Sequence, residues 1–136
     1  MPDFTGSLID HLNLAVPDLP RALAFYAPVL ATLGIEELLA VPADPAADQL
    51  EMHGFGRMPK PFFWLLGDGR VGENMHLAFT AQDRAAVRSF YDTALSAGGT
   101  AVLPPELHPE YHPDYYGAFV LDPNGVTLEA VCHLPQ

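Results

Sequence analysis

The sequence predicts an α+β fold made of two tandem βαβββ modules whose curved sheets form a cleft. The main observation is a repeat: HLNLAV at 11–16 matches HLAFTA at 76–81, an offset of 65 residues that is close to half of the 136-residue chain. The match continues through the segments that follow. The aligned pairs are His11 and His76, Asp18 and Asp83, Phe25-Tyr26 and Phe90-Tyr91, Leu30 and Leu95, and Gly34 and Gly99. We expect one domain over 1–136, with modules at about 6–67 and 73–134.

The first module shows the signals of one strand, one helix and three further strands. Apolar residues alternate over 8–16, which predicts a strand covered on one face. Asp18 is placed to cap a helix with Pro20 in its first turn, and Gly34 ends that helix. Strands are expected at 36–41, 49–55 and 62–66, with a loop where glycines and prolines gather between 54 and 61.

The second module repeats this order after a glycine-rich hinge at 67–72. A strand begins at His76, Asp83 caps a helix, and a further strand is expected at 100–103. The stretch 104–113 holds four prolines and two histidines, so we predict an ordered loop over the site instead of regular structure. A hairpin then joins 116–121 to 126–133 around a Pro-Asn-Gly turn.

Composition favours a compact intracellular protein. Hydrophobic residues make up 49% of the chain and charged residues 17%, as in globular domains. The net charge of −11 opposes binding to nucleic acid and to anionic membrane surfaces. Cys132 is the only cysteine, and neither a secretory signal nor a membrane-spanning stretch of roughly 20 apolar residues is present. We expect a cytoplasmic location, with no nucleic-acid or membrane partner.

Three side chains stand out as candidate ligands of a divalent metal ion. Glu129 is a carboxylate in a mostly apolar strand, 53 residues after His76, and the same count from His11 reaches Trp64. If the two sheets share a concavity, His11, His76 and Glu129 point into it. Two imidazoles and a carboxylate, with positions left for water or substrate, suit a divalent metal. A plain hydrogen-bonded His–Glu pair, or histidines retained from duplication, would leave the same pattern.

These residues, the paired Phe-Tyr helices and the ending AFVLDPNGVTLE (118–129) resemble the vicinal oxygen chelate superfamily, over essentially the whole chain. That superfamily includes glyoxalase I, extradiol dioxygenases, fosfomycin-resistance transferases and bleomycin-binding proteins. The resemblance implies a metal held by His11, His76 and Glu129, substrate oxygens that chelate it, and a homodimer. The ion could be iron, manganese, zinc, nickel or cobalt.

Departures from the family pattern argue against some of the activities found in the superfamily. Glyoxalase I has a fourth ligand where this chain has Trp64. Dioxygenases and fosfomycin transferases share a tyrosine ten residues before the glutamate, where this chain has Phe119. Tyr115, on the same predicted strand face, could supply the missing hydroxyl or could simply line the pocket. No basic residue lies in 101–136, so there is no evident phosphonate clamp.

Other polar residues are weaker candidates. His112 or His108 could act as an acid or base, although loop histidines are more often solvated. Glu51 and His53 share a strand face and could reach the cavity near Trp64. Cys132 lies on the face opposite Glu129 and is expected to be buried.

Two functions from different classes follow. The first is a metal-dependent enzyme of the glyoxalase/dioxygenase type, with lyase, isomerase or dioxygenase chemistry on a small, oxygen-chelating, partly apolar substrate. Its catalytic residues would be Glu129, Tyr115 and His112, with Trp64, Phe119 and Asn13 lining the pocket. No organic cofactor is expected. The second is a non-catalytic protein that binds and sequesters a small drug-like compound, as bleomycin-resistance proteins do.

Overall fold

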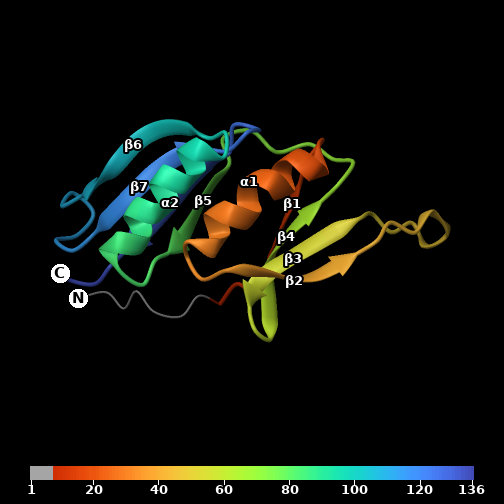
Figure 1. The fold of residues 1–136 in the computed structure, drawn as a ribbon, viewed down its shortest axis with the longest axis horizontal. Helices are drawn as coiled ribbons and strands as arrows, with labels where there is room; N and C mark the ends of the chain where they lie inside the picture. The colour runs from red at the N-terminus through yellow and green to blue at the C-terminus, as the bar shows by residue number, and fades with distance from the viewer. Residues whose placement is uncertain (1–7) are drawn as a thin grey trace.

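The computed structural model describes residues 8–136 and contains the predicted duplication (Figure 1). The first module consists of β1 (Leu12–Ala15), α1 (Leu19–Ala31), β2 (Glu36–Val41), a short 3-10 turn η1 (Pro45–Ala47), β3 (Met52–Arg57) and β4 (Lys60–Leu66). The second consists of β5 (His76–Thr80), α2 (Arg84–Ser96), β6 (Thr100–Leu107), β7 (Tyr116–Leu121) and β8 (Thr127–Cys132). The predicted α+β class and the βαβββ order of each module are therefore confirmed.

Each module folds into its own four-stranded sheet, and the two sheets have the same topology. The strand orders are β1-β4-β3-β2 and β5-β8-β7-β6. In each sheet the strand that opens the module runs parallel to the strand that closes it, while the other pairs are antiparallel. As a result, β1 and β5 both lie at a sheet edge. The two helices lie side by side, each against its own sheet (Figure 1).

The helices begin where the sequence predicts. The Asp18 carboxylate accepts a hydrogen bond from the N–H of Arg21 at 3.1 Å, and Asp83 accepts one from Ala86 at 2.7 Å. Such caps satisfy N–H groups that have no partner within the helix. Each helix buries one apolar face in a shared core, with Phe25, Tyr26 and Val29 from α1 and Val87, Phe90 and Ala94 from α2. Cys132, as expected, is also buried.

A buried polar contact connects the two modules. The Tyr26 hydroxyl in α1 donates a hydrogen bond to the Asp122 carboxylate at 2.5 Å, although the two residues are 96 positions apart. Asp122 also accepts the N–H groups of Asn124 and Val126, which shapes the turn between β7 and β8. Gly125 in this turn has φ +86°, a conformation that glycine adopts without strain. The Asp122 carboxylate therefore stabilises the β7–β8 turn and also binds the first module through Tyr26.

Three strand boundaries differ from the sequence prediction. β1 begins at Leu12 instead of residue 8, since its register with β4 would place Asp10 beside Pro61, which has no N–H to donate. The expected loop around Gly54 and Gly56 is instead a tight hairpin of β3 and β4. An added Cβ at Gly56 would lie 2.0 Å from the Lys60 carbonyl oxygen, so glycine permits this close approach.

The third difference concerns the proline-rich stretch. β6 continues through Pro104 and Pro105 to Leu107, so only the later part of 104–113 is a loop. The register with β7 shifts between Leu103 and Glu106, and β6 is the outermost strand of its sheet. Prolines are tolerated at an edge and at a bulge because no ladder hydrogen bond is lost there.

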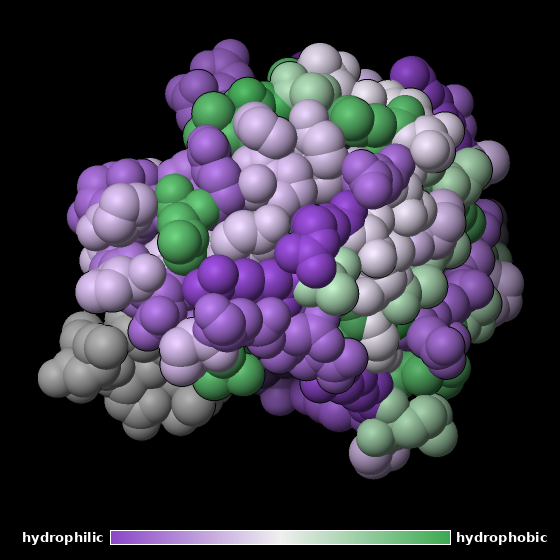
Figure 2. Space-filling model, turned by 60° about the vertical axis from the view of Figure 1, so that its left-hand side comes forward, coloured by the Kyte–Doolittle hydropathy of each residue, from purple (hydrophilic) through white to green (hydrophobic). Residues whose placement is uncertain are grey.

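The face shown in Figure 2 is mainly hydrophilic. Among the coloured residues, the hydrophobic ones form separate groups between polar ones. Within residues 8–136 no helix has the length and apolar character needed to cross a membrane.

Candidate functional site

A polar pair sits on the face of the second sheet that points away from the helices. Leu128 and Ala130 of β8 are buried in the core, so Glu129 between them projects from the opposite face. His76, at the start of the neighbouring β5, reaches the same place, with its Nε2 2.9 Å from Glu129 Oε1. Glu129 is only 3% exposed. A buried carboxylate is stable only when it is paired, and His76 supplies one partner.

Tyr115 supplies the second partner. Its hydroxyl donates a hydrogen bond to Glu129 Oε2, so both carboxylate oxygens are engaged. Burial, followed by the bond to Glu129, raises the pKa of Tyr115 above its ordinary value and keeps the hydroxyl protonated. Phe119 is the cross-strand neighbour of Glu129 and offers no hydroxyl. Tyr115 therefore stands where a hydroxyl can reach the Glu129 carboxylate from the loop.

The loop histidines are buried, contrary to the expectation of solvated side chains. His108 and His112 are 7% and 8% exposed. The His108 N–H bonds to the Tyr115 carbonyl at 2.7 Å, which closes the loop on itself and turns both rings inward. The His108 ring centroid lies 5.5 Å from that of Phe119 and 6.1 Å from that of Tyr115. The loop thus forms an aromatic cover beside the His76–Glu129 pair.

His112 is placed to position Tyr115. Its ring packs edge-on to Tyr115 at 5.5 Å, and its Nε2 lies 2.8 Å from Nδ1 of His133. The N–H of Asp114 donates to His112 Nδ1, which assigns the His112 proton to Nε2 and makes His133 Nδ1 an acceptor. Burial and the neighbouring His112 lower the pKa of His133. Sequence reasoning gave His133 no role, although it continues the alternation that places Glu129 on this face.

His11 is held on the other module. It precedes β1, is exposed, and its Nδ1 lies 2.7 Å from Asp10 Oδ1. Lys60 Nζ lies 2.6 Å from the same carboxylate oxygen. A carboxylate bonded to one imidazole nitrogen fixes the tautomer and leaves the other nitrogen free to bind a metal. Asp10 was not predicted as the partner of His11. The sequence did mark it, because Asp10 is the polar residue in the series of alternate positions that is otherwise apolar from Leu8 to Val16.

The remaining predicted residues lie on the first sheet. Asn13 and Trp64 are cross-strand neighbours, and the Trp64 ring lies over Gly54, where an added Cβ would be 2.7 Å from the indole. His53 pairs instead with Leu65, so it projects from the opposite face and does not approach Trp64. The prediction that Glu51 and His53 reach a cavity near Trp64 was wrong, because the β3–β4 register places the His53 side chain on the opposite face of the sheet from Trp64.

A groove of about 970 Å³ runs between the two modules and is lined by both candidate histidines. Its wall includes His11 with Lys60 on one side and His76 with Phe79 on the other. Within residues 8–136, however, no three His, Cys, Asp or Glu side chains converge on one metal-binding position. The structure therefore brings together His76, Glu129 and Tyr115, whereas His11 stands apart in the same chain.

The donor set fits a divalent metal. Two ligands about 2.1 Å from one ion and at right angles to each other lie about 3 Å apart, close to the 2.9 Å between His76 Nε2 and Glu129 Oε1. Imidazole nitrogen and carboxylate oxygen are both accepted by first-row divalent ions. The pair could thus contribute two of the three predicted ligands.

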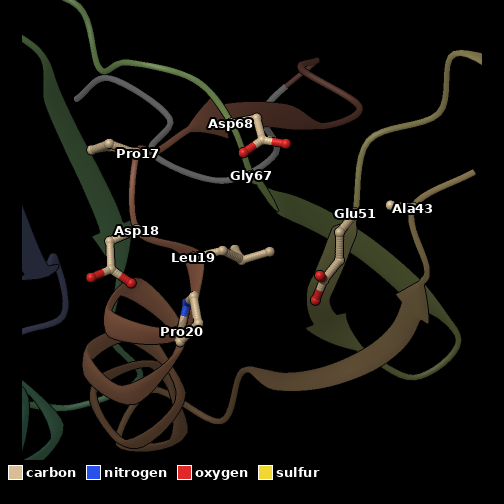
Figure 3. A pocket seen from close by; sticks show the side chains of 8 residues that line it. All are labelled: Pro17, Asp18, Leu19, Pro20, Ala43, Glu51, Gly67 and Asp68. Carbon is tan, nitrogen blue, oxygen red and sulfur yellow. The ribbon is translucent and has the colours of Figure 1, made fainter. Parts of the chain in front are cut away.

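A second hollow lies at the start of α1, with a volume of about 380 Å³ (Figure 3). The side chains of Asp18 and Glu51 flank it on either side of Leu19 (Figure 3). Asp18 already caps α1, and Glu51 lies 2.8 Å from His53 Nε2. These carboxylates have structural partners, so we place the candidate site on the second sheet.

Comparison with known proteins identifies the family. Residues 8–130 match the model of the Glyoxalase/Bleomycin resistance protein/Dioxygenase superfamily. No curated protein matches the chain. Among solved structures, a glyoxalase/bleomycin resistance protein from Albidiferax ferrireducens T118 is 25% identical with a TM-score of 0.74, covering 93% of this chain and 99% of that one.

Two further structures share the fold at lower identity. The fosfomycin resistance protein FosX from Listeria monocytogenes is 17% identical with a TM-score of 0.67, covering 93% of this chain and 94% of its own. A glyoxalase I mutant from Zea mays is 20% identical with a TM-score of 0.67, covering 90% of this chain but 46% of its own. The family match and the duplicated architecture agree: this chain belongs to the glyoxalase/bleomycin resistance protein/dioxygenase superfamily.

Proposed function

We propose that the protein is a divalent-metal-dependent enzyme acting on a small, oxygen-chelating, partly apolar substrate, with the ion held by His11, His76 and Glu129. The observation that carries this proposal is the His76–Glu129 pair, since a 3% exposed carboxylate lies 2.9 Å from an imidazole nitrogen on the sheet face that points away from the helices. The bound ion would act as a Lewis acid on a substrate oxygen.

The chain's own residues would prepare that chemistry. Tyr115 orients the Glu129 carboxylate with the single proton of its hydroxyl. The same hydroxyl would have to leave Glu129 to donate a hydrogen bond to a substrate oxygen that gains charge. His112 and His133 pack against the Tyr115 ring and hold it there. Phe119 and Trp64 would contact apolar parts of the substrate.

A second copy of the chain would complete the site. β1 and β5 are both edge strands, and both border the groove between the modules. We propose a homodimer in which β1 of one copy lies beside β5 of the other, so that His11 of each copy joins His76 and Glu129 of its partner. This arrangement would also cover two exposed sheet edges of each copy.

Metal analysis tests the enzyme proposal directly. Protein purified without a metal-affinity tag should hold close to one ion per chain, and Glu129→Ala should lose it. Glu51→Ala is a matched control, because Glu51 lies 2.8 Å from a histidine nitrogen but directly before β3 of the first module, away from His76 and Glu129. If the parent protein takes up none of iron, manganese, zinc, nickel or cobalt, the enzyme proposal fails and sequestration of a small compound is favoured.

Mixing tests whether the site is shared between copies. His11→Ala and Glu129→Ala should each bind no metal alone. After unfolding and refolding together, random pairing should restore about one site in four, because half the dimers are mixed and each carries one intact site. No recovery in the mixture would show that each site is built within one chain.

Tyr115→Phe separates the role of the hydroxyl from that of the ring. Losing the bond to Glu129 should weaken metal affinity by roughly 10–100-fold, as for other partners of metal ligands. The measurement is competition for the ion with a chelator. Affinity equal to that of the parent would remove Tyr115 from the proposed site.

A further inference from the structure

His108 is a buried imidazole with one nitrogen unsatisfied. Its side chain is 8% exposed, and its Nδ1 lies 2.8 Å from Glu110 Oε1. Because a carboxylate only accepts hydrogen bonds, the contact with Glu110 assigns a proton to Nδ1, and in the neutral form of the ring Nε2 is then an acceptor. Among residues 8–136, Nε2 has no hydrogen-bond partner, and Glu106 Oε1 lies 4.0 Å away. Buried polar atoms are nearly always satisfied, so this one needs an explanation.

The unsatisfied nitrogen belongs to the same face as the candidate metal pair. Glu106 of β6 is the cross-strand neighbour of Gly117 in β7. A Cβ added to Gly117 would lie 3.4 Å from Glu129 Oε2, so the Gly117 position, and with it its neighbour Glu106, faces the same side of the sheet as Glu129. The His108 ring in turn packs edge-on to Phe119, as His76 does at 5.8 Å. His108 and His76 therefore pack against the same Phe119 ring, which places His108 near the candidate metal pair.

The charges around the gap between His108 Nε2 and Glu106 favour a cation. Glu106 and Glu110 flank His108, while none of the six basic residues lies in 101–136. The two arginines of α2 that approach β7 contact Tyr116, whose strand neighbour is the core residue Cys132, so they lie on the other side of the sheet. An anion at the gap would meet carboxylates without a counter-charge.

We propose that the gap between His108 Nε2 and Glu106 binds an ammonium group of the ligand. A donor carrying two N–H bonds can lie about 2.8 Å from each of two acceptors that are 4.0 Å apart, at an angle of about 90°. Tyr111, which is 60% exposed, stacks on the His108 ring at 5.8 Å and brings a second aromatic ring beside this nitrogen. The ligand class is thus a small amine that also carries chelating oxygens.

Assigning this ammonium to the substrate rests on the proposed function, whereas its binding depends only on His108 and Glu106. The two can therefore be tested separately. Metal-free protein with ¹⁵N-labelled histidine is titrated with benzylammonium, benzyl alcohol and benzoate, and the His108 Nε2 resonance is followed by NMR. Benzylammonium should shift this resonance saturably, at millimolar concentrations for so small a ligand. The alcohol should bind more weakly and benzoate should not bind.

Glu106→Gln keeps the shape of the side chain and removes its charge. Benzylammonium should bind about tenfold more weakly to this variant. Glu36→Gln is the matched control, since Glu36 also lies on the outer strand of a sheet opposite a glycine, Gly56, but in the first module. Its affinity for benzylammonium should equal that of the parent.

Equal affinity for benzylammonium in Glu106→Gln and the parent, or tighter binding of benzoate, would overturn the inference. Metal content measured on the same proteins distinguishes the two proposals. Benzylammonium binding without metal uptake would leave the subsite in place and reject the enzyme, whereas metal uptake without benzylammonium binding would reject the subsite alone.

Discussion

The two modules share one scaffold but differ in what their cleft faces carry. Both have a histidine at the start of an edge strand or directly before it, and both have a helix capped by aspartate. In the second module the closing strand presents Glu129, paired with His76 and covered by Tyr115. In the first, the equivalent position is Trp64, which lies over Gly54. The repeat therefore fixes the backbone, whereas single positions decide whether a face is polar or apolar.

The loops add to this asymmetry. The segment after β6 carries His108, His112 and Tyr115 over the second sheet. In the first module the corresponding connection contains the short turn at 45–47, with no buried residue. The polar chemistry is therefore concentrated on one sheet, and the other contributes a histidine at its edge and an aromatic surface.

The largest expected effect is on the contact that unites the modules. Asp122→Ala removes the acceptor for the Tyr26 hydroxyl and for two backbone N–H groups, and should lower the free energy of unfolding by roughly 3 kcal/mol. Tyr26→Phe leaves the turn intact and should cost only about 1–2 kcal/mol. Urea denaturation measures both. Equal losses in the two variants would mean that the turn bonds contribute nothing.

A smaller loss of stability is expected from a substitution at Gly54, over which the Trp64 ring of the first module lies. Gly54→Ala places a Cβ 2.7 Å from the Trp64 ring, and such overpacking should destabilise the protein by about 1–3 kcal/mol. Trp64→Leu shortens the opposing side chain, so the double variant should lose less than the sum of the two single changes. Additive losses in urea denaturation would contradict a direct clash between the two residues.

The smallest expected effect is on the pH dependence of stability, to which His53 and His133 should contribute in opposite directions. Burial lowers the pKa of His53, but hydrogen bonds to Glu51 and Glu37 outweigh it and raise the pKa above the ordinary 6.5. The pKa of His133 is lowered instead, by burial and by His112. The contribution of His53 to stability should therefore be present below pH 6.5 and disappear as the pH rises through its folded pKa. That of His133 should be present above pH 6.5 and disappear as the pH falls.

NMR titration of the histidine Cε1 protons gives both values. Glu51→Gln should move the pKa of His53 downward and leave that of His133 unchanged. If His53 and His133 have the same pKa in the parent protein, the predicted difference between the two modules is absent.

The duplication, the α+β class and the order of elements could be predicted from the amino-acid sequence alone, because strand alternation, helix caps and glycine stops are local signals that recur at a fixed offset. The sequence also placed Phe119 opposite Glu129, since the predicted Pro-Asn-Gly turn sets the register of the hairpin that joins their two strands. Strand ends were less accurate: Pro104 and Pro105 lie in β6 because that strand is an edge, which depends on the strand order of the finished sheet.

Only the tertiary structure decided which side chains meet. The β3–β4 register set His53 opposite Leu65, away from Trp64, and a one-residue slip would have reversed this. The closing of the loop on Tyr115 buried His108 and His112, although their neighbours in the sequence are typical of exposed loops. The contact between Tyr26 and Asp122 joins residues 96 positions apart. Such contacts arise from packing between distant segments, which local patterns in a sequence do not encode.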